Sequence, residues 1–380
     1  MRLFRKIWSA VLVVVILAAA VVPVSAAAEA PEVSAYAAVL YDPVSGAVLY
    51  EKNSGEVLPM ASTTKIMTAL LAFESGRADE VVAVTEEMVA VEGSSMGLQP
   101  GDRLTLGNLA RGMMMASGND GANAIAVFLG GDTARFSAMM NDRAAEIGME
   151  DTCFVTPSGL DAQGHGSTAY DMALLAAEAM DCTAFAETVG ASSLSVEFLE
   201  PEKTVRYENH NRLLSLYADC TGIKTGYTKK AGRCLVSSAE RDGARLICVT
   251  LNAPDDWNDH IALFEYGFSQ FETHTWMADE NTYAVPVAGG TASSVLCRIQ
   301  GEASARLYID AQVTATVSLP RFVYAPVEPE AQLGQVTYRV GDTVVARMPI
   351  VAQESVSAAP DTRNGIQKWL ARIFRPAQGK

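Results

Sequence analysis

The stretch 60-MASTTKIMTALLAFE-74 decides how the rest of the chain is interpreted. From Ile66 onward it carries apolar side chains with no charge until Glu74, a pattern that predicts a helix buried on most sides. Lys65 stands at the start of this helix, three residues after Ser62. Burying an unpaired ammonium group costs several kcal/mol, or forces its pKa from about 10.4 toward neutrality. A lysine at this position therefore needs a chemical reason.

Length and composition indicate a globular protein with one large domain and a smaller one. The chain has 380 residues, 49% of them hydrophobic and 19% charged, and a formal net charge of −15 at pH 7. A chain of this length can bury a sizeable core. Binding to nucleic acid needs a basic face, and the body of the chain shows none, so we expect no nucleic-acid partner.

The N-terminus has the parts of a secretory signal peptide. Basic MRLFRK precedes the apolar stretch IWSAVLVVVILAAAVV, and the small residues VSA at positions 24–26 match a signal-peptidase site. An uncleaved membrane anchor is the alternative, because the apolar run approaches the length that spans a bilayer. Its alanine content and the following Pro23 favour cleavage. The sequence predicts a signal peptide over residues 1–26 and an exported protein that works at the outer face of the cytoplasmic membrane.

Residues 31–270 are predicted to form an α+β domain. A hairpin is expected over 33–52, and two neighbouring strands, joined by ERDG, within 233–251. Helices are expected between and after them: one after Ser62, two broken at 117–119 with Thr105 as the first N-cap, one over 169–180, and one ending at 268. Helices enclosed by early and late strands predict an antiparallel sheet with helices packed on it.

Beyond residue 276 the sequence changes to short runs rich in β-forming residues. Gly341-Asp342, between QVTYRV and TVVARM, suits a two-residue hairpin turn. We therefore expect a second, small all-β domain over residues 277–355.

The segment 361–380 has the pattern of a basic amphipathic helix. One helical face would carry its apolar side chains and the other faces its cations: Ile366, Trp369, Leu370, Ile373 and Phe374, against Lys368, Arg372 and Arg375. Such a helix at the end of an acidic chain is typical of an interfacial membrane anchor. A terminal helix docked on the protein itself is the alternative.

Cysteines and histidines give no sign of a metal or cofactor site. The six cysteines are scattered without a Cys-x-x-Cys pair, and Cys234 and Cys248 fall in apolar runs. We expect core thiols there, with a 234–248 cross-strand bridge as the alternative. The four histidines lack metal-ligand spacing, so surface or loop roles are expected, with His165 near the functional loops at most shaping a substrate site.

Three short motifs are weak alone and strong together. Ser62 and Lys65 are three residues apart, so they share one helical face, although a serine there could also be an ordinary helix cap. Ser117-Gly118-Asn119 falls at a break between helices, and Lys224-Thr225-Gly226 precedes strand-like sequence. In this order the three match the motif set of penicillin-binding proteins and class A β-lactamases.

The resemblance extends beyond the motifs. MASTTKIMTALLA, GDRLTLGNLARGMMMASGNDGANAIA, TPSGLDAQGHGSTAYDMALLA, NHNRLL and GIKTGYTKKAGRCLVSSAERDGARLI are similar to segments of the serine-type D-alanyl-D-alanine carboxypeptidases, the low-molecular-mass penicillin-binding proteins of peptidase family S11. The similarity covers about residues 33–270, and the β-rich domain and tail follow in the same order. It implies a penicillin-binding protein/β-lactamase-like fold: an antiparallel sheet with helices on both faces, a helical subdomain and a small all-β domain. Thr221 departs from the family, which usually has Asp there.

The resemblance also implies roles for individual residues. Ser62 would be the acylated nucleophile and Lys65 its general base, Ser117 would relay a proton, and Asn119 would orient Lys65 and the substrate amide. Substrate would be held by Lys224, Thr225 and Gly226, with the backbone N–H groups of Ser62 and Tyr227 as the oxyanion hole. The implied reaction removes the terminal D-alanine from peptidoglycan pentapeptide stems ending in D-Ala-D-Ala, during cell wall biosynthesis or remodelling. β-Lactam antibiotics would be covalent inhibitors, and no metal or cofactor is implied.

Three alternative functions fit the sequence less well. A class A β-lactamase needs a Glu-x-x-Leu-Asn loop, and Glu208 to Asn211 lacks the Leu and lies only 16 residues before Lys224. Gly93-Ser94-Ser95-Met96-Gly97 satisfies the hydrolase pattern Gly-x-Ser-x-Gly but lacks the strand before it and the helix after it. A non-catalytic cell-wall binder or penicillin sensor is disfavoured because all the catalytic residues are present.

Overall fold

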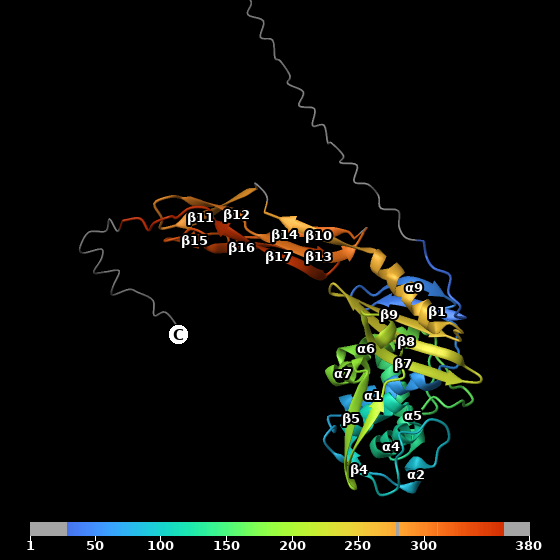
Figure 1. The fold of residues 1–380 in the computed structure, drawn as a ribbon. Helices are drawn as coiled ribbons and strands as arrows, with labels where there is room; N and C mark the ends of the chain where they lie inside the picture. The colour runs from blue at the N-terminus through green and yellow to red at the C-terminus, as the bar shows by residue number, and fades with distance from the viewer. Residues whose placement is uncertain (1–28, 279–280, 310, 361–380) are drawn as a thin grey trace, which may run out of the picture.

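The computed structural model describes residues 29–278, 281–309 and 311–360, which form a helix-containing domain and a β-rich domain. Figure 1 shows the β-rich domain extending sideways from the end of the first domain where α9 lies. In the described part of the chain, no helix combines the length and hydrophobicity needed to cross a membrane. The predicted signal peptide (1–26) and terminal helix (361–380) lie outside the described residues.

A five-stranded antiparallel sheet organises the first domain. Its strand order is β2-β1-β9-β8-β7, and every neighbouring pair runs antiparallel. The strands are β1 (Ala37–Asp42), β2 (Ala47–Lys52), β7 (Cys220–Thr228), β8 (Gly232–Arg241) and β9 (Ala244–Leu251). The hairpin predicted over 33–52 and the strands predicted within 233–251 are confirmed. β7 is left as an edge strand.

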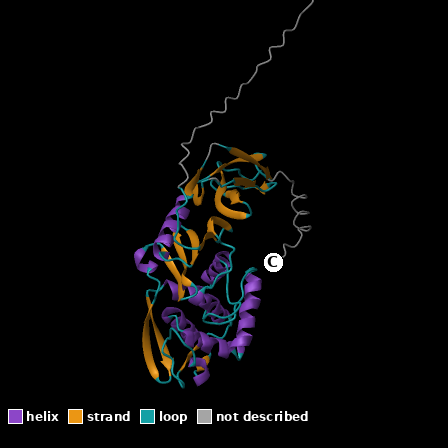
Figure 2. Ribbon diagram, turned by 90° about the vertical axis from the view of Figure 1, so that its right-hand side faces the viewer, coloured by secondary structure: helices purple, strands orange, loops and turns teal. Residues whose placement is uncertain are grey.

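The two faces of the sheet belong to two separate cores, because side chains alternate along each strand. Val39 and Val249 pack with the helices of one side, whereas Leu40 and Cys248 pack with α9 (Asp256–Ser269) on the other. Figure 2 shows helices on both sides of these strands. The predicted α+β class, with helices on both faces, is confirmed.

The helical side is built around α1 (Lys65–Glu74), the helix predicted from the opening stretch. Around it lie α3 (Leu106–Ala116), α4 (Asn119–Gly130), α5 (Thr133–Ile147), α6 (Ala169–Asp181) and α7 (Thr183–Gly190). The Thr105 side chain accepts a hydrogen bond from Asn108 N, as an N-cap does. Shorter elements complete the domain: β3 (Val81–Ala83), α2 (Glu86–Val89), β4 (Arg103–Thr105), the hairpin β5 (Ser193–Leu199) and β6 (Glu202–Glu208), and α8 (Leu213–Leu216).

The β-rich domain contains a six-stranded sheet with the order β14-β16-β17-β12-β11-β15 and a separate pair, β10 with β13. The strands are β10 (Phe271–Met277), β11 (Thr282–Ala288), β12 (Ser294–Ile299), β13 (Glu302–Tyr308), β14 (Val313–Ser318), β15 (Val323–Tyr324), β16 (Gln332–Val340) and β17 (Thr343–Ala352). The turn predicted at Gly341-Asp342 is confirmed, because Val340 pairs directly with Thr343. The domain bounds 31–270 and 277–355 stay predictions.

All six cysteines are free. Cys248 lies opposite Ser237 in the β8–β9 ladder, whereas Cys234 lies opposite Gly226 on the other side of β8. The alternative of a 234–248 bridge is therefore wrong, and the expectation of buried core thiols at both positions is confirmed.

Candidate active site

Ser62 lies in a 3₁₀ turn, η1 (Ala61–Thr64), that runs directly into α1. Ala61 has a φ of 47°, a left-handed conformation that residues with a Cβ seldom adopt. Gly159 lies so close that an added Cβ would be 1.8 Å from the Ala61 carbonyl oxygen. The N-cap of α1 is Thr64, and the Ser62 side chain does not cap the helix. The ordinary capping role is therefore excluded, and the surrounding chain holds the turn in shape.

Lys65 is fully buried, and its Nζ takes part in three hydrogen bonds. Its Nζ lies 3.0 Å from Ser62 Oγ, 2.7 Å from Asn119 Oδ1 and 2.6 Å from the Ser158 carbonyl oxygen. Burial holds its pKa well below the ordinary value, and the nearby Lys224 ammonium lowers it further. The geometry therefore places a lysine that favours its neutral form in contact with the serine hydroxyl.

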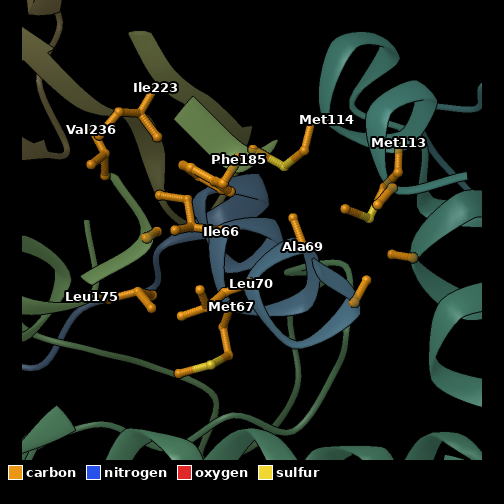
Figure 3. Close-up of a cluster of buried hydrophobic side chains, with 14 of the residues drawn as sticks. Ile66, Met67, Ala69, Leu70, Met113, Met114, Leu175, Phe185, Ile223 and Val236 are labelled. Carbon is orange, nitrogen blue, oxygen red and sulfur yellow. The ribbon is translucent and has the colours of Figure 1, made fainter. Parts of the chain in front are cut away.

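Apolar packing around α1 supplies the burial. Ile66, Met67, Ala69 and Leu70 follow Lys65 and are all fully buried. Figure 3 shows these side chains meeting residues of other helices and of the sheet, among them Phe185. Because this packing removes water from the start of the helix, it penalises the charged form of Lys65.

The second motif, Ser117-Gly118-Asn119, lies at the same site as Ser62 and Lys65. Ser117 is the left-handed C-cap of α3, with φ 55°, and Asn119 begins α4. The Asn119 side chain donates to the Glu92 carbonyl oxygen at 2.7 Å, so its oxygen is the atom that faces Lys65. Both residues are buried. Within the described ranges, no hydrogen bond links the Ser117 hydroxyl to Ser62 or Lys224.

The segment 93–98 is a loop clamped against this motif. Asp120 is buried and accepts hydrogen bonds from Ser95 Oγ at 2.6 Å, Met96 N at 2.9 Å and Leu98 N at 3.0 Å. No strand precedes the loop directly and no helix follows it directly. The rejection of this segment as a hydrolase elbow is confirmed.

The third motif lies on the edge strand β7, against the turn of Ser62. Lys224 is buried, and burial lowers its pKa to about 7. Its Nζ donates to the Thr225 carbonyl oxygen at 3.1 Å. A Cβ on Gly226 would lie 3.0 Å from the Met60 carbonyl oxygen and 3.1 Å from Ser62 N. A side chain at this position would crowd the backbone of η1, so glycine favours the close approach of β7 to η1, in addition to the clear strand edge expected from the resemblance.

The three motifs meet at one cavity of about 300 Å³. Five predicted site residues line it: Ser62, Ser117, Thr225, Gly226 and Tyr227. Lys65 and Asn119 are joined to this wall through the hydrogen bonds described above. The structure thus brings together residues that are up to 165 positions apart in the chain.

Sequence analysis missed other residues that line this cavity: Ser94, His210, Arg233, Asp256 and Trp257. Arg233 donates to Asp256 Oδ1 from Nη2 at 2.6 Å and from Nε at 3.1 Å. Its guanidinium lies 5.3 Å from the centre of the Trp257 ring. No local signal marks these residues, although the β7–β8 ladder places Arg233 opposite Tyr227. A prediction of the β7–β8 register would have placed Arg233 beside Tyr227, and so at the site.

The histidines depart in part from expectation. His165 is buried, accepts from Val155 N at 2.9 Å through Nδ1 and bonds Thr64 Oγ1 at 3.0 Å through Nε2. Burial lowers its pKa to about 4. A neutral ring thus ties the loop at 155–165 to the turn of Ser62, without lining the cavity. The described residues contain no group of His, Cys, Asp and Glu side chains arranged to hold a metal ion.

His260 corrects the expectation of a surface or loop role. It lies on α9, fully buried, and bonds Ser237 Oγ and Thr250 Oγ1 of the sheet. The sequence around His260 does not show whether the side chain is buried. Its two hydroxyl partners lie on strands of the sheet, and only the fold brings them to α9.

Thr221 lies at a register shift of β7, between Cys220 and Gly222. Its hydroxyl is buried and lacks a hydrogen-bond partner in the described chain. The departure noted in the sequence thus falls at the start of the strand and outside the residues that line the cavity.

Comparison with known proteins gives a consistent result. Residues 24–255 match the family model of the D-alanyl-D-alanine carboxypeptidases, Peptidase_S11. D-alanyl-D-alanine carboxypeptidase DacF of Bacillus subtilis (strain 168) is 31% identical over 316 residues, 80% of each chain. DacC of Escherichia coli (strain K12), of the same description, is 31% identical over 319 residues, 79% of this chain and 78% of the relative.

Solved structures extend the similarity to both domains. Penicillin binding protein 5 from Haemophilus influenzae superposes with a TM-score of 0.61 at 26% identity, covering 87% of this chain and 99% of that one. D-alanyl-D-alanine carboxypeptidase DacD from Francisella tularensis gives a TM-score of 0.59 at 26% identity, covering 87% and 95%. The fold class inferred from sequence is the fold of these proteins.

Proposed function

The chain belongs to the D-alanyl-D-alanine carboxypeptidase family, peptidase S11, and from this premise we propose that Ser62 is the nucleophile of a serine-type carboxypeptidase. The observation that carries the proposal is the 3.0 Å contact between Ser62 Oγ and a buried Lys65 whose pKa is well below its ordinary value. A neutral amine next to a hydroxyl can take its proton during attack, which is the arrangement that activates a serine.

Acylation would follow from the positions of the motif residues. Lys65 takes the Ser62 proton as Ser62 Oγ attacks the carbonyl carbon of the penultimate D-alanine. The backbone N–H groups of Ser62 and Tyr227 stabilise the oxyanion. Ser117, on the opposite wall, would pass a proton to the leaving amine, supplied through Lys224. The C–N bond breaks, D-alanine leaves, and water then hydrolyses the ester.

The terminal carboxylate of the substrate would be held by Lys224 and Thr225, and Gly226 would leave room for the peptide along the edge strand. Arg233 supports this assignment of a carboxylate site. It lines the cavity, its side chain is 41% exposed, and Asp256 orients its guanidinium group. Cations at this end of the cavity favour a substrate that ends in a free carboxylate.

β-Lactams would acylate Ser62 and remain bound as covalent inhibitors. Rapid hydrolysis, as in a class A β-lactamase, would need a buried acid positioned to activate water. Glu208, the nearest sequence match, has 70% of its side chain exposed and pairs with Arg206. Asp256 is a buried acid that lines the cavity, but Arg233 holds its carboxylate with two hydrogen bonds. Neither acid supports the β-lactamase alternative.

The site of action would be the cell envelope, where peptidoglycan stem peptides are found. Export through the predicted signal peptide, and membrane-surface binding by the predicted helix 361–380, are parts of this proposal. Deleting 361–380 should release most of the protein from membranes and leave activity on a soluble peptide unchanged. Membrane association as strong without 361–380 as with it would remove the anchor role.

Labelling with a fluorescent penicillin tests the nucleophile. The chain without residues 1–26 should become covalently labelled and should release D-alanine from a peptide ending in D-Ala-D-Ala. Ser62→Ala should abolish both, whereas Ser215→Ala, at an exposed serine outside the cavity, should keep both. Label on the Ser62→Ala variant would refute the assignment. Labelling of the parent without any D-alanine release would instead support a penicillin sensor.

A further inference from the structure

Three loops at the outer end of the β-rich domain carry little charge. The loops, residues 288–294, 319–327 and 355–360, contain a single charged residue, Arg321, although 19% of the whole chain is charged. Backbone hydrogen bonds join the loops to one another: Ala325 N to Ala288 O, Ala359 N to Gly289 O, and Val356 N to Val327 O. They therefore form one continuous surface, which we call the aromatic end.

Two aromatic side chains project from this surface. Phe322 is 50% exposed and Tyr324 74% exposed, and their rings pack edge to face with centroids 5.3 Å apart. Val323, between them, packs against the domain core. Alternation along the strand thus directs both rings outward. Exposed aromatic rings beside a lone arginine are typical of the interface between a membrane and water.

The position of the aromatic end relates it to the C-terminal segment. β15 pairs with β11, and Figure 1 shows both strands at the end of the domain that lies away from α9. The described chain ends there, because Ala358 bridges Gly290. Ile366, the first apolar position of the amphipathic pattern, is six residues beyond Pro360. Six extended residues span at most about 21 Å. A surface that binds Ile366 must therefore lie within about 21 Å of Pro360, which belongs to the aromatic end.

We propose that the aromatic end contacts an anionic lipid bilayer, with Phe322 and Tyr324 in the headgroup region and Arg321 facing the lipid phosphates. The proposal rests on the envelope location proposed above. A bilayer fits this surface better than a second copy of the chain, because the three loops carry one cation and no acid within their bounds, with Glu328 and Glu354 directly beside them, and the sequence that follows Pro360 is net basic. With this end on the membrane, the β-rich domain separates the active site from the bilayer.

Vesicle binding tests the proposal in two backgrounds, with and without residues 361–380, each lacking residues 1–26. The vesicles contain equal parts of phosphatidylglycerol and phosphatidylcholine, and bound protein is measured by co-sedimentation. Replacing Phe322→Ser and Tyr324→Ser together should weaken vesicle binding about tenfold in both backgrounds. The matched control replaces Val44→Ser and Met277→Ser, which are 67% and 68% exposed away from the aromatic end, and should bind like the parent.

Two results would overturn the proposal. One is vesicle binding by the Phe322/Tyr324 variant equal to that of the parent in both backgrounds. The other is self-association of the parent without vesicles, in the ultracentrifuge, that the same variant abolishes, since a second copy would then cover the aromatic end. Penicillin labelling of Ser62 is measured on every variant and should not change, so a failure of the membrane proposal is distinguishable from a failure of the proposed function.

Discussion

Two buried basic side chains lie on opposite sides of the central sheet, and only one of them is equipped for chemistry. Lys65, on the side of α1, and His260, on α9, are both fully buried. Burial lowers the pKa of both, that of His260 to about 3. Burial thus shifts both groups toward their neutral forms.

Their hydrogen-bond partners separate the two groups. Lys65 contacts Ser62, which lines the cavity. His260 contacts Ser237 and Thr250, which are themselves fully buried strand residues. Burial favours the neutral form of each base, but only a base whose partner lines a cavity can act on a substrate. A lowered pKa by itself is therefore a poor sign of catalysis.

The largest effect is expected from Lys65→Arg. A guanidinium cannot lose its proton, so the variant has no neutral base beside Ser62. The rate of covalent labelling by fluorescent penicillin should fall by about 10³-fold or more. Circular dichroism should show that the variant is folded, and Lys65→Met serves as a second variant of smaller volume. A labelling rate within tenfold of the parent in both would contradict the role of Lys65 as base.

His260→Ala should have the opposite profile. It leaves a cavity in the α9 core and removes the partner of two buried hydroxyls, so the free energy of unfolding should fall by about 3 kcal/mol. Urea unfolding measures the loss, and the acylation rate of the folded variant should stay within threefold of the parent. His260→Gln, which keeps a polar partner, should lose less stability. Loss of acylation in a folded His260→Ala protein would show that the two sides of the sheet are coupled.

Lys224 is a third buried base, and the pH dependence of stability tests whether it loses its proton on folding. Its pKa of about 7 in the folded protein lies below the ordinary 10.5, so between these values the unfolded chain binds more protons than the folded one. The contribution of Lys224 to stability should therefore rise with pH from about 7, by roughly 1.4 kcal/mol per unit. The stability difference between parent and Lys224→Met, from urea unfolding at pH 7, 8 and 9, should show this slope.

Activity should change in the opposite direction over the same pH range. Deprotonation of Lys224 removes a cation that is proposed to hold the substrate carboxylate, so kcat/KM for a D-Ala-D-Ala peptide should fall above pH 7. A flat stability difference, together with a flat kcat/KM, would mean that Lys224 stays charged in the folded protein.

The smallest effect is expected at an exposed charged group. Glu208 and Arg206 form a pair at 3.2 Å with both side chains 70% exposed. Glu208→Gln should change the free energy of unfolding by less than about 0.5 kcal/mol. The rate at which the penicillin acyl-enzyme decays should be unchanged within twofold. A tenfold slower decay would revive the β-lactamase alternative.

The sequence predicted the elements of the fold well where periodic patterns and turn residues were strong. The hairpin at 33–52, helix α1, the break at Ser117 and the turn at Gly341-Asp342 all depend on local residue preferences. The β5–β6 hairpin went unpredicted. Its tight turn at Glu200-Pro201 carries none of the Asn-Gly or Asp-Gly signals of a two-residue hairpin.

Within the candidate site, the predicted residues came from motifs, and the missed ones have no motif. Arg233 and Trp257 reach the cavity only because β8 pairs with β7 and α9 starts beside them. The reason for Gly226 was only partly visible, since its close approach to Met60 involves a turn 166 residues earlier.

The sequence by itself determined the family, the fold class and a lysine that must sit in an apolar helix beside a serine, because these follow from residue types at short spacing. Only the tertiary structure decided which buried base meets a cavity. Lys65 and His260 both lie on helices with apolar faces, and nothing local distinguishes them. The difference arises from long-range packing, which places Ser62 at the edge strand β7 and seals Ser237 and Thr250 between the sheet and α9.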